Sequence, residues 1–180
     1  CFPHGVFTMA HANALGKDNV LGVSIGGGDT SGYFAGITAT NNITVNSKVT
    51  LGAKGLAAML GMLDAGTATF TGDFTGNMLS QVFLHAVPGA TARFSGAFSM
   101  NDNANNYSLE VTGGGTVELS GDNAAVNQKS LNARVGSTVL GHANAAGTKP
   151  INLGGVVPGE FTVRAFVDRT FNQAGAGWKD

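Results

Sequence analysis

The stretch of residues 90–100 reads ATARFSGAFSM, and it decides the expected fold. Its even positions are apolar or glycine, and its odd positions are mostly polar. Successive side chains of a β-strand point to opposite faces of the sheet, so this alternation is typical of a half-buried strand. The stretch therefore predicts a β-protein whose strands have one apolar face and one polar face.

Alternation recurs on both sides of this stretch. Residues 107–112 (YSLEVT) and 116–120 (TVELS) flank three glycines, which predicts an antiparallel hairpin with a glycine turn. Residues 161–167 alternate again, and residues 82–87 are apolar on nearly both faces, as in a central strand. About nine or ten strands of this kind fit an all-β fold, a β-sandwich with the jelly roll as one candidate topology.

One segment departs from the alternation. Residues 55–64 read GLAAMLGMLD, which is apolar almost throughout and rich in Ala, Leu and Met, all good helix formers. We predict one short helix here that closes an end of the sandwich, with a buried loop as the alternative. No internal repeat of about 20 to 50 residues is evident. We therefore expect an N-terminal arm over residues 1–18 and a single β-sandwich domain over residues 19–180.

The composition limits the partners. The chain has 180 residues, a formal net charge of −1 and 12% charged residues, where about 25% is usual. The exposed faces must therefore consist largely of Thr, Ser, Asn and Gly, which leaves little charge to keep copies of the chain apart. The ten Lys and Arg are scattered singly, so we expect no nucleic acid partner. No run of about 18 apolar residues predicts a membrane-spanning helix.

The first residues bear on location. The chain begins Cys1-Phe2-Pro3-His4 without an initiator Met, which we interpret as a processed secretory precursor of extracellular or cell-surface location. Cys1 is the only cysteine, so an internal disulfide is excluded. A lipidated N-terminal residue, an intermolecular bridge and a free thiol all stay open for Cys1.

No combination of residues predicts an active site. The sequence lacks a Gly-x-Ser-x-Gly elbow and zinc-like spacing of His and Cys. His85 lies inside an apolar strand, which favours a hydrogen-bonded core histidine over a catalyst. Glu110 and Glu118 would lie on facing arms of the predicted hairpin, and an exposed pair is a better interpretation than a glycosidase pair. We therefore expect no enzymatic activity.

Calcium is the one ligand that the sequence suggests. Ca²⁺ prefers about six to eight oxygen ligands from Asp, Asn and backbone carbonyls in loops. Asp102 and Asn103 crowd one predicted loop, and Asp122 and Asn123 crowd another. These four residues are candidate calcium ligands that would fasten loops or subunits, and ordinary turn chemistry is the alternative explanation.

The N-terminal arm suggests an assembly role. Residues 5–12 read GVFTMAHA, and a short apolar arm can add a strand to the exposed edge of a neighbouring sheet. The candidate assembly residues are Val6, Phe7, Met9 and Ala10. Repeated from copy to copy, such a contact builds a homopolymer.

The general layout resembles that of donor-strand-complemented extracellular filament subunits of the pilin type. The resemblance covers the apolar arm, a Gly-, Thr- and Asn-rich sandwich and the final alternating strand at residues 161–167. It implies a structural subunit of an extracellular filament or pilus whose arm inserts into the next copy. A viral jelly-roll capsid or decoration protein and a secreted carbohydrate-binding β-sandwich module are the alternative functions.

Overall fold

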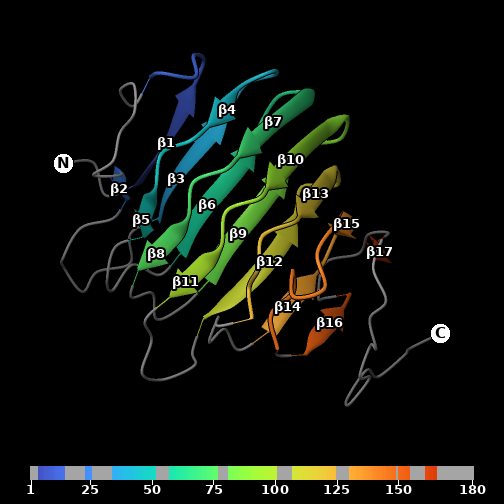
Figure 1. Cartoon of the computed structure of the whole chain (residues 1–180). Coiled ribbons are helices and arrows are strands. Elements are labelled where there is room, and N and C mark those ends of the chain that lie inside the picture. The colour runs from blue at the N-terminus through green and yellow to red at the C-terminus, as the bar shows by residue number, and fades with distance from the viewer. Residues whose placement is uncertain are drawn as a thin grey trace.

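The chain folds as a parallel β-solenoid (Figure 1). The structure, a computed structural model, describes residues 4–14, 23–25, 34–51, 57–76, 81–100, 107–124, 130–148, 150–154 and 161–165. Every strand pairing among these residues is parallel. The all-β prediction is confirmed, but the β-sandwich and the jelly roll are wrong, because both are built from antiparallel strands.

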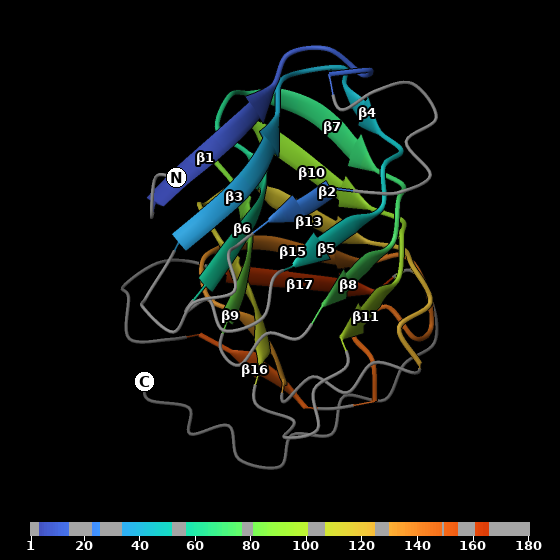
Figure 2. The ribbon, with the colours of Figure 1, turned by 90° about the vertical axis from the view of Figure 1, so that its left-hand side faces the viewer.

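Three parallel sheets surround one core, as the end-on view in Figure 2 shows. The seven-stranded sheet has the spatial order β1 (His4–Met9), β3 (Phe34–Ala39), β6 (Ala57–Met62), β9 (Gln81–Ala86), β12 (Ser108–Thr112), β14 (Ser130–Ala133) and β16 (Ile151–Leu153). The six-stranded sheet has the order β17 (Phe161–Ala165), β15 (Gly136–Leu140), β13 (Thr116–Leu119), β10 (Ala90–Phe94), β7 (Gly66–Phe70) and β4 (Thr44–Val45). The four-stranded sheet has the order β11 (Phe98–Met100), β8 (Phe74–Gly76), β5 (Val49–Leu51) and β2 (Val23–Ile25).

Each turn of the solenoid passes through the sheets in a fixed sequence. The chain runs from β6 to β7 to β8, and the next turn runs from β9 to β10 to β11. Gly66 pairs with Ala90 and Thr91 pairs with Thr116, which are offsets of 24 and 25 residues. The chain therefore contains a structural repeat of this length, although none was evident in its sequence.

The core consists of the inward-facing row of each strand, stacked turn upon turn. Phe70 stacks on Phe94 with a ring-centroid distance of 4.9 Å, and Phe74 stacks on Phe98 at 4.6 Å, both with an interplanar angle of 14°. All four phenyl rings are buried. Equivalent side chains of successive turns thus lie directly over one another, and their burial supplies the main driving force for folding.

The segment predicted to be a helix is a central strand instead. Ala57–Met62 forms β6, which pairs with β3 on one side and β9 on the other. Its inward residues Leu60 and Met62 are completely buried. Helix propensity, even that of Ala, Leu and Met, contributes little free energy per residue. Backbone hydrogen bonds to the two neighbouring strands and the burial of the inward-facing side chains override it.

The predicted hairpin at the glycine run is also wrong. β12 belongs to the seven-stranded sheet and β13 to the six-stranded sheet, so the two strands do not pair with each other. Gly113 and Gly114 have positive φ angles of 99° and 83° and turn the chain from one sheet into the next. Glu110 and Glu118 therefore lie on different sheets.

One buried hydroxyl in the core leads to a prediction of increased stability. Thr138 is fully buried on β15, and its Oγ1 has no hydrogen-bond partner. Its in-register neighbours are Val117 and Val163. Thr138→Val is expected to stabilise the fold by about 1 kcal/mol, because valine has nearly the same shape and no unsatisfied polar group. Chemical denaturation measures the change.

Thr38→Val is the matched control for Thr138→Val. Thr38 is equally buried, but its Oγ1 forms a 2.9 Å hydrogen bond with Oγ1 of Thr8. Its replacement is expected to lower the free energy of unfolding, because the partner hydroxyl loses its bond. Equal effects of the two substitutions would contradict the explanation.

No helix among the described residues combines the length and the apolar character needed to cross a membrane.

Candidate functional site

Among the described residues, Glu110 is the one fully buried charged side chain. It lies on β12 between Leu109 and Val111, whose side chains belong to the core. Because side chains alternate along a strand, Glu110 projects from the opposite face of the seven-stranded sheet. A carboxylate in such a place is costly unless it is paired and hydrogen-bonded.

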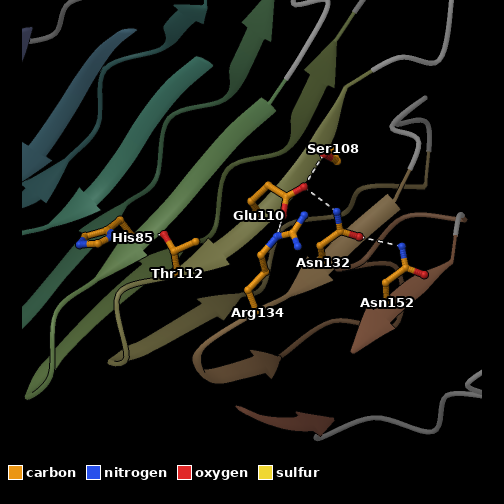
Figure 3. Close-up of polar contacts among 7 residues, drawn as sticks. All are labelled: His85, Ser108, Glu110, Thr112, Asn132, Arg134 and Asn152. Atoms are coloured by element: carbon orange, nitrogen blue, oxygen red, sulfur yellow. Dashed lines mark hydrogen bonds and ion pairs between the residues drawn. The ribbon is translucent and has the colours of Figure 1, made fainter. Parts of the chain in front are cut away.

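Three donors surround the carboxylate of Glu110 (Figure 3). The hydroxyl of Ser108 donates a 2.6 Å hydrogen bond to Oε1, and Nδ2 of Asn132 donates a 2.5 Å bond to the same oxygen. Nε of Arg134 donates to Oε2 and forms an ion pair with it. Both carboxylate oxygens thus have donors from the protein itself.

Strand register brings these residues together. Glu110 pairs with Asn132 across β12 and β14, and Asn132 pairs with Asn152 across β14 and β16. Oδ1 of Asn132 accepts a 2.7 Å hydrogen bond from Nδ2 of Asn152, so the polar row continues over three strands. We call Ser108, Glu110, Asn132, Arg134 and Asn152 the Glu110 network.

The Glu110 network is suited to fixing strands. The side chain of Glu110 is 1% exposed, whereas that of Arg134 is 26% exposed. A general acid or base must come within hydrogen-bonding reach of a substrate, and buried Glu110 already accepts hydrogen bonds from three side chains. The arrangement therefore favours a structural role, in which one carboxylate ties together β12, β14 and, through Asn132, β16.

His85 lies on the same sheet face in a second polar contact. It pairs in register with Thr112 of β12, and its Nδ1 lies 3.0 Å from the Thr112 hydroxyl oxygen (Figure 3). The ring is partly buried, and this burial lowers the pKa of His85 below its ordinary value of 6.5. The histidine is hydrogen-bonded, as the sequence suggested, although it is not completely buried.

The lowered pKa of His85 predicts a dependence of stability on pH. The unfolded chain takes up the proton at a higher pH than the folded chain, so protonation favours unfolding. The stability that neutral His85 provides is present above about pH 6.5 and is lost as the pH falls through the lower, folded-state pKa. The free energy of unfolding, measured from pH 8 to about pH 5, is expected to fall less steeply in His85→Gln than in the native chain. Parallel curves for the two proteins would contradict this assignment.

The structure describes two of the four predicted calcium ligands. Asp122 Oδ1 accepts hydrogen bonds from the Ala124 amide at 3.0 Å and from the Asn144 side chain at 2.9 Å. The first of these bonds, assisted by the second, lowers the pKa of Asp122. Buried Asn123 accepts a 2.8 Å bond from the Phe98 amide and donates a 2.6 Å bond to the Ala145 carbonyl.

These contacts give Asp122 and Asn123 a role at a corner of the solenoid, where they connect successive turns. Asp102 and Asn103 lie outside the described residues. Within the described part of the chain, no group of three or more His, Cys, Asp or Glu side chains is arranged to hold a metal ion. Calcium binding stays a prediction.

A row of hydroxyl groups runs along the outer face of the six-stranded sheet. Its members pair in register from strand to strand: Thr67, Thr91, Thr116, Ser137 and Thr162. Beside this row, Arg93 and Glu118 form an exposed 3.0 Å ion pair between neighbouring strands. The recurring Thr at the start of the segments 67–74, 91–98 and 116–123 is the sequence signal for this row, and it was missed.

The predicted assembly residues lie at the N-terminal edge of the seven-stranded sheet. Val6, Phe7 and Met9 are part of β1, and Ala10 follows it. β1 pairs with β3 of its own chain, so the segment forms the first strand of its own solenoid. Met9 is buried, but Phe7 is 51% exposed and Val6 is 37% exposed. No strand among the described residues pairs with the other edge of β1.

Comparison of the chain with protein-family models, curated proteins and solved structures finds no match. Cys1 lies outside the described residues, so lipidation, an intermolecular disulfide and a free thiol all stay open for it.

Proposed function

We propose that this protein is a non-enzymatic structural subunit that associates with further copies of itself, outside the cell or on its surface. The observation that carries the proposal is the edge strand β1, with two exposed large apolar side chains and one unpaired backbone edge among the described residues. Such an edge is a template for pairing with another chain.

The exposure of Phe7 is best understood from its place in the stack. Phe7 pairs with Ile37 of β3, and both belong to the inward-facing row of the seven-stranded sheet. Ile37 is only 2% exposed, because β1 and β6 flank it, whereas Phe7 has β3 on one side only. A further strand beside β1 would bury Phe7 as β1 buries Ile37, with the usual gain from removing apolar surface from water.

Two other features support a structural role. The Glu110 network uses its buried carboxylate to join strands. The outer face of the six-stranded sheet carries a continuous row of neutral hydroxyl groups. Low net charge also permits close association of identical chains. The jelly-roll capsid and the β-sandwich binding module are not carried forward, because both depended on the antiparallel fold that the solenoid replaces.

Sedimentation of the purified chain over a wide concentration range tests the proposal. The average mass is expected to rise above that of the monomer as the concentration increases. A chain that stays monomeric at every concentration would overturn the proposal. Sedimentation and thermal melts with added calcium and with a chelator test the calcium prediction. If calcium fastens loops or subunits, the mass distribution or the melting temperature depends on calcium.

A further inference from the structure

The geometry of β1 points to one mode of association: two copies pair through their β1 strands, antiparallel and related by a two-fold axis. This inference rests on the proposed self-association and adds its partner, which is the same strand of a second copy. The alternative is a head-to-tail contact, in which β1 of one copy meets the opposite end of the next. Three observations favour the two-fold contact.

The first observation is strand length. In a head-to-tail stack that continues the seven-stranded sheet, β1 would pair with β16, which has three residues (Ile151–Leu153). β1 has six residues, His4–Met9. When two β1 strands pair antiparallel with Phe7 opposite Phe7, residues 5–9 of one copy lie opposite residues 9–5 of the other. This contact offers five cross-strand residue pairs where β16 offers three.

The second observation is the distribution of exposed apolar side chains. Among the described residues, the exposed large hydrophobic side chains are Val6, Phe7 and Leu63. The strands at the other end hold partly buried residues such as Ile151 and Val163, which pack against the core. A head-to-tail contact would cover Phe7 of one copy with an end that has no exposed large apolar side chain within the described residues. A two-fold contact buries Val6 and Phe7 of both copies at once.

The third observation is charge. Residues 4–14 contain no Asp, Glu, Lys or Arg. Soluble proteins commonly protect an edge strand with a charge, most often Lys, which opposes pairing between identical edges. β1 has no such group, so two copies approach without electrostatic repulsion at neutral pH.

The side-chain directions also fix the register. Directly opposite residues of an antiparallel pair point to the same face of the sheet. With Phe7 opposite Phe7, both rings lie on the core side of the sheet. Each ring then covers the exposed end of the inward-facing row of the other copy. Aromatic pairs of this kind are favourable in neighbouring strands. Because the same patch is used on both copies, the assembly closes as a dimer.

Phe7→Lys tests the interface against Leu63→Lys as a matched control. Both substitutions place a charge at an exposed large hydrophobic position, but Leu63 follows β6, which β3 separates from β1 in the sheet. Sedimentation is expected to show that Phe7→Lys abolishes the dimer while Leu63→Lys keeps it. Circular dichroism and a thermal melt establish that both variants are folded. A dimer that survives in folded Phe7→Lys would overturn the inference.

Disulfide trapping tests the symmetry itself. In a Cys1→Ser background, the single cysteine of Phe7→Cys faces its own copy across the two-fold axis, within the range that a disulfide can span. Mild oxidation is expected to give a covalent dimer with Phe7→Cys and much less with Leu63→Cys. If the native chain associates into species larger than a dimer and the cysteine at position 7 does not cross-link, the two-fold contact is wrong while self-association stands. A native chain that is always monomeric overturns both.

Discussion

Replacing Gly96 by alanine is expected to destabilise the solenoid by about 3 kcal/mol or more. A Cβ atom at Gly96 would lie 2.0 Å from the carbonyl oxygen of Gly72 in the preceding turn. The obstacle is backbone, so it cannot move aside as the end of a flexible side chain can. The chain would have to push two turns apart at this corner, against the stacked rings of Phe70 and Phe94.

The same close approach recurs along the corner between the six-stranded and four-stranded sheets. A Cβ at Gly72 would lie 2.1 Å from the Ser47 carbonyl oxygen, and one at Gly121 would lie 2.4 Å from the Gly96 carbonyl oxygen. These glycines are therefore required by the spacing between turns. This explains why glycine follows the Thr or Ser in FTGDF, FSGAF and LSGDN.

Denaturant unfolding of Gly96→Ala measures the loss, and Gly5→Ala is the control. Gly5 lies in β1, and an added Cβ there meets no atom within 4 Å. Its replacement is expected to change the free energy of unfolding by less than about 1 kcal/mol. If the two variants lost similar amounts of stability, close backbone packing would not be the reason for Gly96.

Many of the strands were predictable from the sequence, although β6 was predicted as a helix, but the partners of the strands were not. In residues 90–100 the alternation correctly separates buried Ala92 and Phe94 from exposed Arg93. Alternation with a period of two describes one strand facing one core, and it is the same in a sandwich and in a solenoid. The run is also bent into two strands, β10 and β11, at Ser95-Gly96-Ala97, and the alternation gives no sign of that bend.

The decisive signal was the repeat at offsets of 24 and 25 residues. The repeat is degenerate, because the position held by Phe70 and Phe94 in two successive turns is held by Leu119 in the next turn. The offsets between other turns vary with the lengths of the loops. Such repeats are recognised when the segments 67–74, 91–98 and 116–123 are aligned on the glycine. Once aligned, they predict parallel stacking, because equivalent residues of successive turns then lie side by side.

The Glu110 network could not be predicted without the pairing register of β12 and β14. The sequence reveals this register only once the repeat of 24 to 25 residues is recognised. Glu110 lies 22 residues from Asn132 and 24 from Arg134, and only parallel pairing of β12 and β14 brings the three together. The exposed apolar residues Val6 and Phe7 were easier to single out, since an apolar stretch is visible in the sequence alone. Their place in the first strand of the chain's own solenoid was not predicted, because a detached arm and a first strand have the same composition.

Removing Arg134 from the Glu110 network is expected to cost about 3 kcal/mol of stability. In Arg134→Met the carboxylate of Glu110 stays buried without its ion-pair partner. This loss is at the low end for a broken buried pair, because the donors of Ser108 and Asn132 remain. The matched control is Arg93→Met, which breaks the exposed pair with Glu118 and is expected to cost less than about 1 kcal/mol.

A second substitution separates the charge from the packing. In the double variant Glu110→Gln with Arg134→Met, the amide oxygen still accepts hydrogen bonds from Ser108 and Asn132, but no buried charge is left. The double variant is therefore expected to be more stable than Arg134→Met alone, since an uncompensated buried charge costs more than a neutral group of the same shape. Denaturant unfolding of the four proteins of this cycle gives the coupling between the two residues. If Glu110→Gln brought no recovery, the stem of Arg134 would stabilise the sheet through its packing, and the ion pair would not be what holds β12 and β14 in register.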